Sequence, residues 1–210
     1  LSSELILWSS NLAGLFSVHS EYSTGSSIMP QKRNPDSLEL IRSKANIIRG
    51  KSQEFSNIIS NLPLTYFKDF QEDKKIIFEC FDELSLCLNV MSDVIKKSQF
   101  NKKIGVELCE INYATATDLA DYLVIEKNIP FRNSYKTIAD IIQFASNSNM
   151  KLSEISLKEF QNFEKSIDSN IYQYIDIKKS LGRKKTSMST NPKEVVKKIN
   201  KFQKLLKQNA

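Results

Sequence analysis

The residues best suited to chemistry lie in one short segment, Ser23–Asp36, whose composition differs from that of the rest of the chain. It brings together a glycine, two prolines, four small hydroxyl residues and two bases, Lys32 and Arg33. Gly25 gives the backbone freedom, and the prolines stiffen its far end. Because Pro35-Asp36 leads directly into a predicted helix, the segment ends at a helix N-terminus, which favours an anion. From composition alone, the segment is either a mobile lid over a carboxylate- or phosphate-bearing substrate or an inert connection.

Two charged residues outside this segment fall on predicted helices. Lys74 lies three residues before Ile77 on an apolar stripe, with Gln71 on the same face, and an unpaired buried charge there is costly. A lysine can also extend its long side chain from such a stripe into solvent. Glu39 falls in a first helical turn, where the helix dipole favours any acid. Both residues therefore have a structural explanation beside a functional one.

Histidine and cysteine predict no reactive site on their own. His19, the only histidine, lies just before the segment, and we expect a loop residue without a chemical role. The three cysteines, Cys80, Cys87 and Cys109, are odd in number and lack CxxC spacing. Cys80 and Cys87 share one helical face, where free thiols behave as small apolar groups. This cysteine usage fits a reducing cytoplasm best.

The elements that would position these residues are long helices. Only 5 Gly and 5 Pro occur in 210 residues, which disfavours a sheet of many hairpins. Two segments, separated by Asn61-Leu62-Pro63, carry apolar residues at helical spacing. The first stripe comprises Leu38, Ile41, Ala45, Ile48, Phe55 and Ile59, and the second comprises Ile77, Phe81, Leu84, Leu88, Met91 and Ile95. A helix over Asp69–Lys97 would be about 40 Å long, so its stripe must pack in a bundle, within the chain or across an oligomer.

The pattern of elements changes near residue 112. We expect a first helix over Ser2–Asn11, so early in the chain that its native start is predicted to lie upstream. The later helices are shorter, at Ala114–Lys127, Ser134–Ser146 and Ser156–Ser166, with Pro192 opening a last one. The sequence therefore predicts an all-α chain with two domains: a helical-bundle region over 1–112, containing the loop 23–36, and a small helical domain over 113–210.

The net charge of +6 is a property of the tail. From Lys178 onward there are 11 Lys/Arg and a single acid, Glu194, so residues 1–177 carry a net charge of −4. The tail also has an apolar helical stripe and no known nucleic-acid motif, so we expect the solvated face of a packed helix and neither a nucleic-acid nor a membrane partner. The stripe comprises Val195, Val196, Ile199, Phe202, Leu205 and Leu206. No segment predicts a signal peptide or a membrane span.

One long motif adds a family resemblance. Gly25–Pro35 reads GSSIMPQKRNP and resembles the GSSxMPxKxNP signature of the fumarase/aspartase superfamily. The next ten residues, Asp36–Ala45, resemble the corresponding segment of argininosuccinate lyases. Leu62–Tyr66, Lys68-Asp69, Gln71–Lys74, Ala116–Val124 and Pro130–Arg132 also resemble that family. The resemblance covers nearly the whole chain but only about half of a full-length lyase. It implies a central helical bundle followed by a small C-terminal domain.

The resemblance implies an elimination reaction without cofactor or metal, which converts argininosuccinate to fumarate and arginine in arginine biosynthesis. A group must take a weakly acidic proton, donors must hold a doubly charged carboxylate, and an acid must assist the leaving guanidine. Ser26 matches the proton-transfer residue, as base or as acid. A bare serine is a poor base, so an alkoxide would need Lys32 and loop N–H groups beside it. Ser27 is a neighbouring candidate for substrate binding.

The remaining matched positions bind substrate or support catalysis in the family. Lys32 and Asn34 match holders of a substrate carboxylate, and Glu39 matches the acid that orients a catalytic histidine. The substrate contacts of the family also match Tyr66, Gln71 and Lys74. That histidine belongs to the N-terminal half of the family's chain, and each active site draws on three subunits of a homotetramer. We therefore expect this chain to form a partial site and to be inactive alone.

Two departures and two alternatives remain. Ser134, Tyr135 and Ala139 replace a usual Ala-His pair and Gly, and 187–190 reads SMST where the family has GGTA. Both lie away from the matched chemistry. One alternative is another lyase of the superfamily, such as an adenylosuccinate lyase, although Leu62–Lys74 and Ala116–Val124 argue against it. The other is a non-catalytic helical protein, as in lens crystallins.

Overall fold

The computed structural model describes residues 1–208, which form two compact units, unit 1 over residues 1–104 and unit 2 over residues 105–208. Ten α-helices account for most of the described residues, and the strands are four segments of two residues each. The all-α prediction is confirmed. Within residues 1–208, no helix is both long enough and apolar enough to span a membrane.

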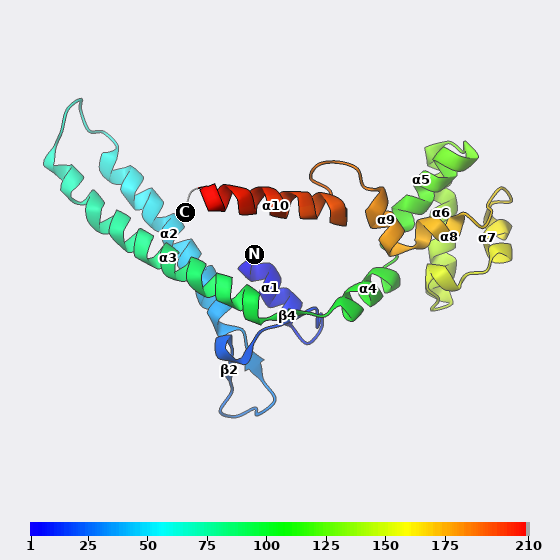
Figure 1. Cartoon of the computed structure of the whole chain (residues 1–210), viewed down its shortest axis with the longest axis horizontal. Helices are drawn as coiled ribbons and strands as arrows, with labels where there is room; N and C mark the ends of the chain where they lie inside the picture. Colours follow the sequence, from blue (N-terminus) through cyan, green and yellow to red (C-terminus); the bar gives the residue numbers. More distant parts are fainter. Residues whose placement is uncertain (209–210) are drawn as a thin grey trace. The chain divides into compact units, whose positions relative to one another are not determined.

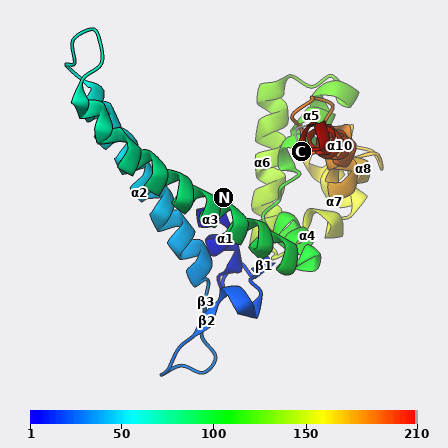
Figure 2. The ribbon, with the colours of Figure 1, turned by 60° about the vertical axis from the view of Figure 1, so that its left-hand side comes forward.

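Two long helices form the frame of unit 1. α2 (Asp36–Ile59) and α3 (Asp73–Lys97) lie side by side, as both ribbon views show (Figure 1, Figure 2). α1 (Ser2–Ser9) packs against α2. β1 (Phe16–Ser17) pairs antiparallel with β4 (Gln99–Phe100), so the chain before α2 is tied to the chain after α3.

The interface between α2 and α3 buries few apolar side chains. Leu38 and Val94 are fully buried in a small cluster with Leu5 and Phe16. Along the rest of the pair, Lys44 forms an ion pair with Glu83, and Lys51 forms one with Glu79. Much of the predicted stripe of α3 is exposed: Phe81 is 69% exposed and Leu88 is 61% exposed, whereas Met91 packs against the small cluster. Unit 1 by itself therefore leaves most of that stripe uncovered.

The predicted rod over Asp69–Lys97 begins with a different helix type. A 3₁₀ turn, η2 (Lys68–Gln71), precedes α3, which starts at Asp73. The segment between α2 and η2 includes Thr65 at φ 105°, a strained conformation for a β-branched residue. The α-helix therefore starts a few residues later than its apolar pattern predicts.

Unit 2 consists of shorter helices, and its one core lies within residues 113–175. The helices are α4 (Lys102–Ile111, which starts in unit 1), α5 (Ala116–Lys127), α6 (Phe131–Asn147), α7 (Leu157–Phe163), α8 (Ile171–Ile175), α9 (Ile177–Arg183) and α10 (Pro192–Gln208). Tyr122, Leu123, Ile141 and Phe160 are completely buried in the core. Asn128, in the left-handed region at φ 54°, ends α5.

Several boundaries in unit 2 differ from the expected ones. α6 starts at Phe131, directly after Pro130, three residues earlier than predicted, and α7 ends at Phe163 rather than Ser166. Pro192 does open the last helix, but the apolar stripe of α10 is exposed in the described residues, with Phe202 at 62%. Unit 2 therefore does not cover that stripe. The contacts in the structure divide the chain at residue 104. The domain boundary at residue 112 stays a prediction.

Candidate active-site segments

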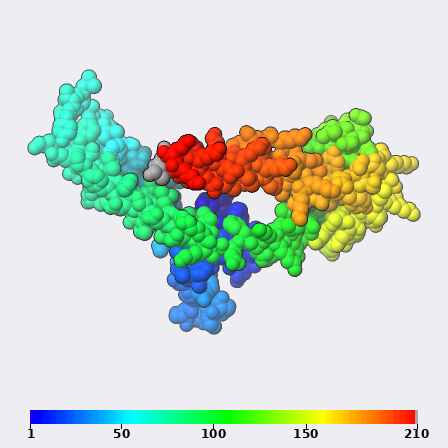
Figure 3. All heavy atoms as spheres, in the orientation of Figure 1, coloured from blue at the N-terminus to red at the C-terminus, as the bar shows by residue number. Residues whose placement is uncertain are grey.

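The segment singled out by composition folds into a β-hairpin that leads into α2. β2 (Thr24–Gly25) pairs antiparallel with β3 (Arg33–Asn34). The Lys32 N–H donates to the Met29 carbonyl at 3.0 Å and turns the chain back near the tip. Ile28 at the tip is 87% exposed, and in the space-filling view the hairpin stands out from the helices of unit 1 (Figure 3). We call residues 24–34 the signature hairpin.

The Ser26 side chain forms hydrogen bonds within the signature hairpin. Its Oγ accepts hydrogen bonds from the Ile28 and Met29 N–H groups, both at 3.2 Å. Two backbone donors on one oxygen favour negative charge there, as in an oxyanion hole. Among the hydrogen bonds of residues 1–208, none joins Lys32 to Ser26. The N–H groups expected for an alkoxide are thus in place, whereas the expected lysine contact is not.

Four other predicted site residues lie near Ser26 along the chain. Ser27 and Lys32 are exposed on the signature hairpin, and Asn34 is half-buried on β3, opposite Thr24. Glu39 is exposed in the first turn of α2. The structure therefore gathers five of the eight predicted residues at the N-terminal end of α2.

The other three lie beyond the C-terminal end of α2. The Tyr66 ring stacks on Phe70 with centroids 5.9 Å apart, and the Lys74 Nζ donates to the Phe70 carbonyl at 3.1 Å. Lys74 also pairs with Asp73 at 3.2 Å and its side chain is 61% exposed, so of its two readings the one that extends the side chain into solvent applies here. Gln71 is exposed in η2. Phe70 was not predicted, although its spacing of four from both neighbours was a usable signal.

The two groups of residues are far apart within unit 1. α2 has 24 residues, which correspond to about 36 Å at 1.5 Å per residue. Figure 1 shows the signature hairpin at one end of the α2–α3 pair and the connection containing Tyr66 at the other. One small substrate cannot contact both groups in the same chain.

His19 has a structural role in the described residues. Its Nδ1 accepts from the Glu21 N–H at 3.3 Å and so caps the 3₁₀ turn η1 (Ser20–Tyr22). Its own N–H donates to the Ser98 Oγ at 3.1 Å. These contacts place His19 before the signature hairpin, at the end of α3.

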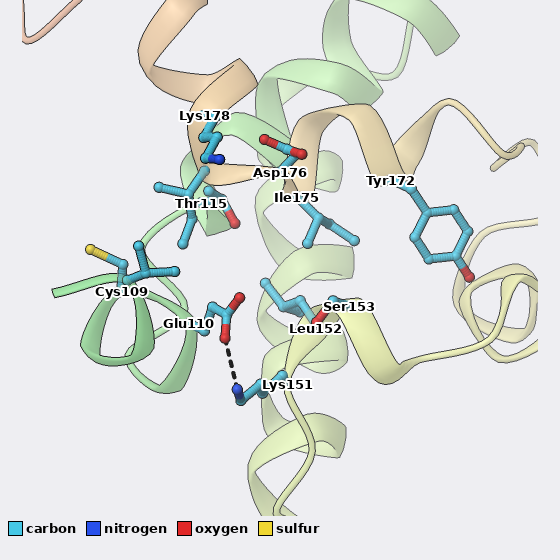
Figure 4. A pocket seen from close by; sticks show the side chains of 12 residues that line it. Cys109, Glu110, Thr115, Lys151, Leu152, Ser153, Tyr172, Ile175, Asp176 and Lys178 are labelled. Atoms are coloured by element: carbon cyan, nitrogen blue, oxygen red, sulfur yellow. Dashed lines mark hydrogen bonds and ion pairs between the residues drawn. The ribbon is translucent and has the colours of Figure 1, made fainter. Parts of the chain in front are cut away.

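A pocket of about 380 Å³ lies in unit 2, and none of the eight predicted site residues lines it (Figure 4). Leu152 and Ile175 form an apolar part of its wall. At the rim, Glu110 and Lys151 pair with each other at 2.7 Å, and the carboxylate of Asp176 caps α9 by accepting from the Lys179 N–H. These charges are engaged within the protein. No group of three potential metal ligands occurs in the part of the chain that the structure describes.

The most buried charge belongs to Asp118 in α5, which is 5% exposed. Its carboxylate binds Arg183 at 2.9 Å and Lys184 at 2.8 Å. Burial by itself raises the pKa of Asp118, but hydrogen bonds from Lys184, Ser180 and Arg183 outweigh it and hold the pKa below its usual value. Asp118 therefore joins α5 to the end of α9.

Comparisons with known proteins define the class first. A family model described as Lyase matches residues 1–50, and one described as Argininosuccinate lyase C-terminal matches residues 113–182. Two solved structures share the fold: EDDS lyase variant with bound fumarate (TM-score 0.86, 23% identity, 99% of this chain and 43% of that chain) and EDDS lyase in complex with formate (TM-score 0.83, 24% identity, 95% and 41%). The chain thus has the fold of a lyase.

The curated relatives narrow the class. Argininosuccinate lyases of Pelagibacter ubique, Nitratiruptor sp. and Campylobacter hominis are 36%, 38% and 39% identical over 204, 208 and 207 residues. The matches cover 97–99% of this chain, which spans 44–45% of the length of these relatives. Over nearly its whole length, the chain thus matches the C-terminal part of argininosuccinate lyases.

Proposed function

We propose that this chain supplies the loop-bearing part of an argininosuccinate lyase, which splits argininosuccinate into fumarate and arginine in arginine biosynthesis. The observation that carries the proposal is the signature hairpin, in which two backbone N–H groups converge on the Ser26 oxygen. The family match supports the choice of substrate. Arginine biosynthesis and the three free cysteines fit a cytoplasmic protein.

In the proposed reaction, a proton leaves the β-carbon of the succinyl group and an aci-carboxylate forms. Cleavage of the Cα–N bond then gives fumarate and arginine. The Ile28 and Met29 N–H groups favour charge on the Ser26 oxygen, which supports a role as the base. Lys32 and Asn34 would hold the carboxylate that gains charge, with Ser27 as a further contact. Glu39 would orient a histidine that lies outside this chain.

The separation of the two residue groups supports a homo-oligomer as the active form, with a tetramer as the family's arrangement. The signature hairpin and the Tyr66–Lys74 group lie at opposite ends of α2, about 36 Å apart. Two copies packed antiparallel would bring the hairpin of one copy to the Tyr66, Gln71 and Lys74 of the other. The exposed stripe of α3 offers the apolar surface for such packing.

The test is a complementation assay. The purified chain is mixed with a full-length argininosuccinate lyase inactivated at its loop serine, and fumarate release from argininosuccinate is followed by ultraviolet absorbance. We expect activity only in the mixture, because the partner supplies the histidine and this chain supplies Ser26. Ser26→Ala should lower the activity at least about 100-fold.

The matched control is Ser52→Ala, which removes an exposed serine in the middle of α2 and should leave the activity unchanged. Co-sedimentation of the two proteins without activity would contradict the proposal. Turnover of adenylosuccinate in preference to argininosuccinate would instead assign the chain to another reaction of the same type.

A further inference from the structure

The segment that carries the signature hairpin has little structure of its own. It consists of His19 and η1 (Ser20–Tyr22), a single 3₁₀ turn directly before β2. A turn of three residues is not stable alone, since 3₁₀ hydrogen bonds are poorly aligned and helix nucleation is unfavourable. The position of the hairpin therefore depends on contacts from other elements to residues 19–22, which we call the stalk.

The end of α3 makes three of these contacts. The Ser98 Oγ accepts from the His19 N–H at 3.1 Å. The Lys97 ammonium forms an ion pair with Glu21 and lies 5.5 Å from the centre of the Tyr22 ring. Lys97 is also the last residue of α3, where a cation interacts favourably with the helix dipole. A single side chain thus contacts two successive residues of the stalk.

The start of α2 makes the fourth contact. The Ser37 hydroxyl donates to the Tyr22 carbonyl at 2.8 Å. This hydrogen bond joins the two ends of the hairpin segment and closes a loop that contains every residue between Tyr22 and Ser37. Inside the loop, the backbone is ordered by the short β2–β3 pairing, the turn near Met29 and the two hydrogen bonds to the Ser26 oxygen. Without the closing bond, more of the segment would be free to move.

These contacts order the stalk locally and add little to the free energy of unfolding of the whole chain. The side chains of Lys97 and Glu21 are 46% and 57% exposed, and exposed ion pairs contribute little to the free energy of unfolding. The hydrogen bond and the charge of Lys97 nevertheless hold the pKa of Glu21 below its usual value, so the pair is intact at neutral pH. Neither Lys97 nor Ser37 belongs to the predicted site.

We propose that Lys97 and Ser37 are positioning residues that hold the signature hairpin, and with it Ser26, Lys32 and Asn34, in place for the reaction. The inference rests on the proposed function. Both residues act through the stalk and touch no reacting atom. They raise the fraction of molecules in which the hairpin is ready to receive substrate.

The test compares Lys97→Met, which keeps an apolar stem but removes the charge, and Ser37→Ala with the unchanged chain in the complementation assay. If the hairpin is ordered in a smaller fraction of molecules, the apparent affinity for substrate falls in proportion. Saturating substrate then returns the hairpin to its ordered position. We therefore expect KM for argininosuccinate to rise about three- to tenfold while kcat stays within about twofold. Lys97→Arg keeps the charge and should leave KM close to that of the unchanged chain. Lys96→Met, one residue earlier and exposed, is the matched control and should change neither constant.

A second readout does not need turnover. Amide hydrogen exchange of residues 24–34 in the chain alone should be faster in Lys97→Met and Ser37→Ala than in Lys96→Met, while exchange in the middle of α2 stays the same. Unchanged exchange together with an unchanged KM would overturn the inference, and so would a lower kcat at constant KM. If even the unchanged chain gives no activity, the proposed function fails, and the exchange comparison still decides whether the two residues order the hairpin.

Discussion

Asp118 carries a charge into the interior of unit 2, with two cations bound to its carboxylate. Asp118→Asn would leave Arg183 and Lys184 facing an uncharged amide. Since both cations are partly exposed, we expect a loss of about 1–3 kcal/mol in the free energy of unfolding, measured by denaturant titration. Asp121→Asn, one turn further on the exposed side of α5, should change it by less than about 0.5 kcal/mol.

The pH dependence of that loss follows from the lowered pKa of Asp118. A group whose folded pKa is depressed stabilises the fold above its unfolded pKa, and that stabilisation disappears as pH falls through the folded pKa. The difference between the unchanged chain and Asp118→Asn should therefore be constant at neutral pH and shrink below the usual aspartate pKa, about 3.9. A difference that persists unchanged in strong acid would mean that the carboxylate charge is not its source.

At the level of residues, sequence predicted the chemistry of the hairpin better than its contacts. The motif singled out Ser26, and serine chemistry required donors beside it, but nothing identified Ile28 and Met29 as those donors. Lys97 was not singled out at all, because it contacts a stalk 76 residues earlier in the chain. For Lys74 the sequence left open a buried, paired charge or a side chain extended into solvent, and the structure shows the second, with Lys74 paired to Asp73 at the start of α3.

Among the elements, α3 carries an exposed apolar surface through which copies of the chain can associate. Six apolar residues of its stripe and its flanks are more than 40% exposed: Ile77, Phe78, Phe81, Leu84, Leu88 and Ile95. Leu88→Asp would place a charge on this surface, at a side chain that is 61% exposed. We expect it to shift the chain from oligomer to monomer in analytical ultracentrifugation.

The matched control is Asn89→Asp, which adds the same charge one residue further, at an exposed position outside the stripe. It should leave the sedimentation unchanged. If Leu88→Asp and the unchanged chain sediment alike, the stripe is not the surface through which copies associate.

Helical periodicity predicted the long elements and also α7, whereas α8 and α9 escaped it. α2 and α3 each carry several repeats of the apolar pattern, so their existence was evident from the sequence. α8 and α9 have five and seven residues, too few for a period to be distinguished from chance. The two-residue strands form because the ends of loops meet in space, which no local pattern records.

For the whole molecule, the division into two units should be visible in unfolding. Trp8 is the only tryptophan and packs against Phe100 in unit 1, whereas the larger core belongs to unit 2. We expect thermal unfolding followed by Trp8 fluorescence and by far-ultraviolet circular dichroism to give different curves. Asp118→Asn should shift only the dichroism curve. Coincident curves that shift together would mean that the two units unfold as one.

The two domains that the sequence predicts, with a boundary at residue 112, stay a prediction, and the contacts in the structure divide the chain at residue 104. Long repeats before residue 112 and short helices after it suggested two domains. The division between the units falls inside α4, which starts at Lys102 in unit 1 and continues into unit 2. A helix that crosses a boundary gives no turn residue or linker by which sequence could locate it.

The length of α2 limits how this chain can change over evolutionary time. Each residue inserted into α2 alone would lengthen it by about 1.5 Å and rotate everything beyond by about 100°. The ion pairs from Lys44 and Lys51 to α3 would then lose their register. Insertions and deletions should therefore be tolerated directly after the end of α2, but within the helix pair only when both helices change together.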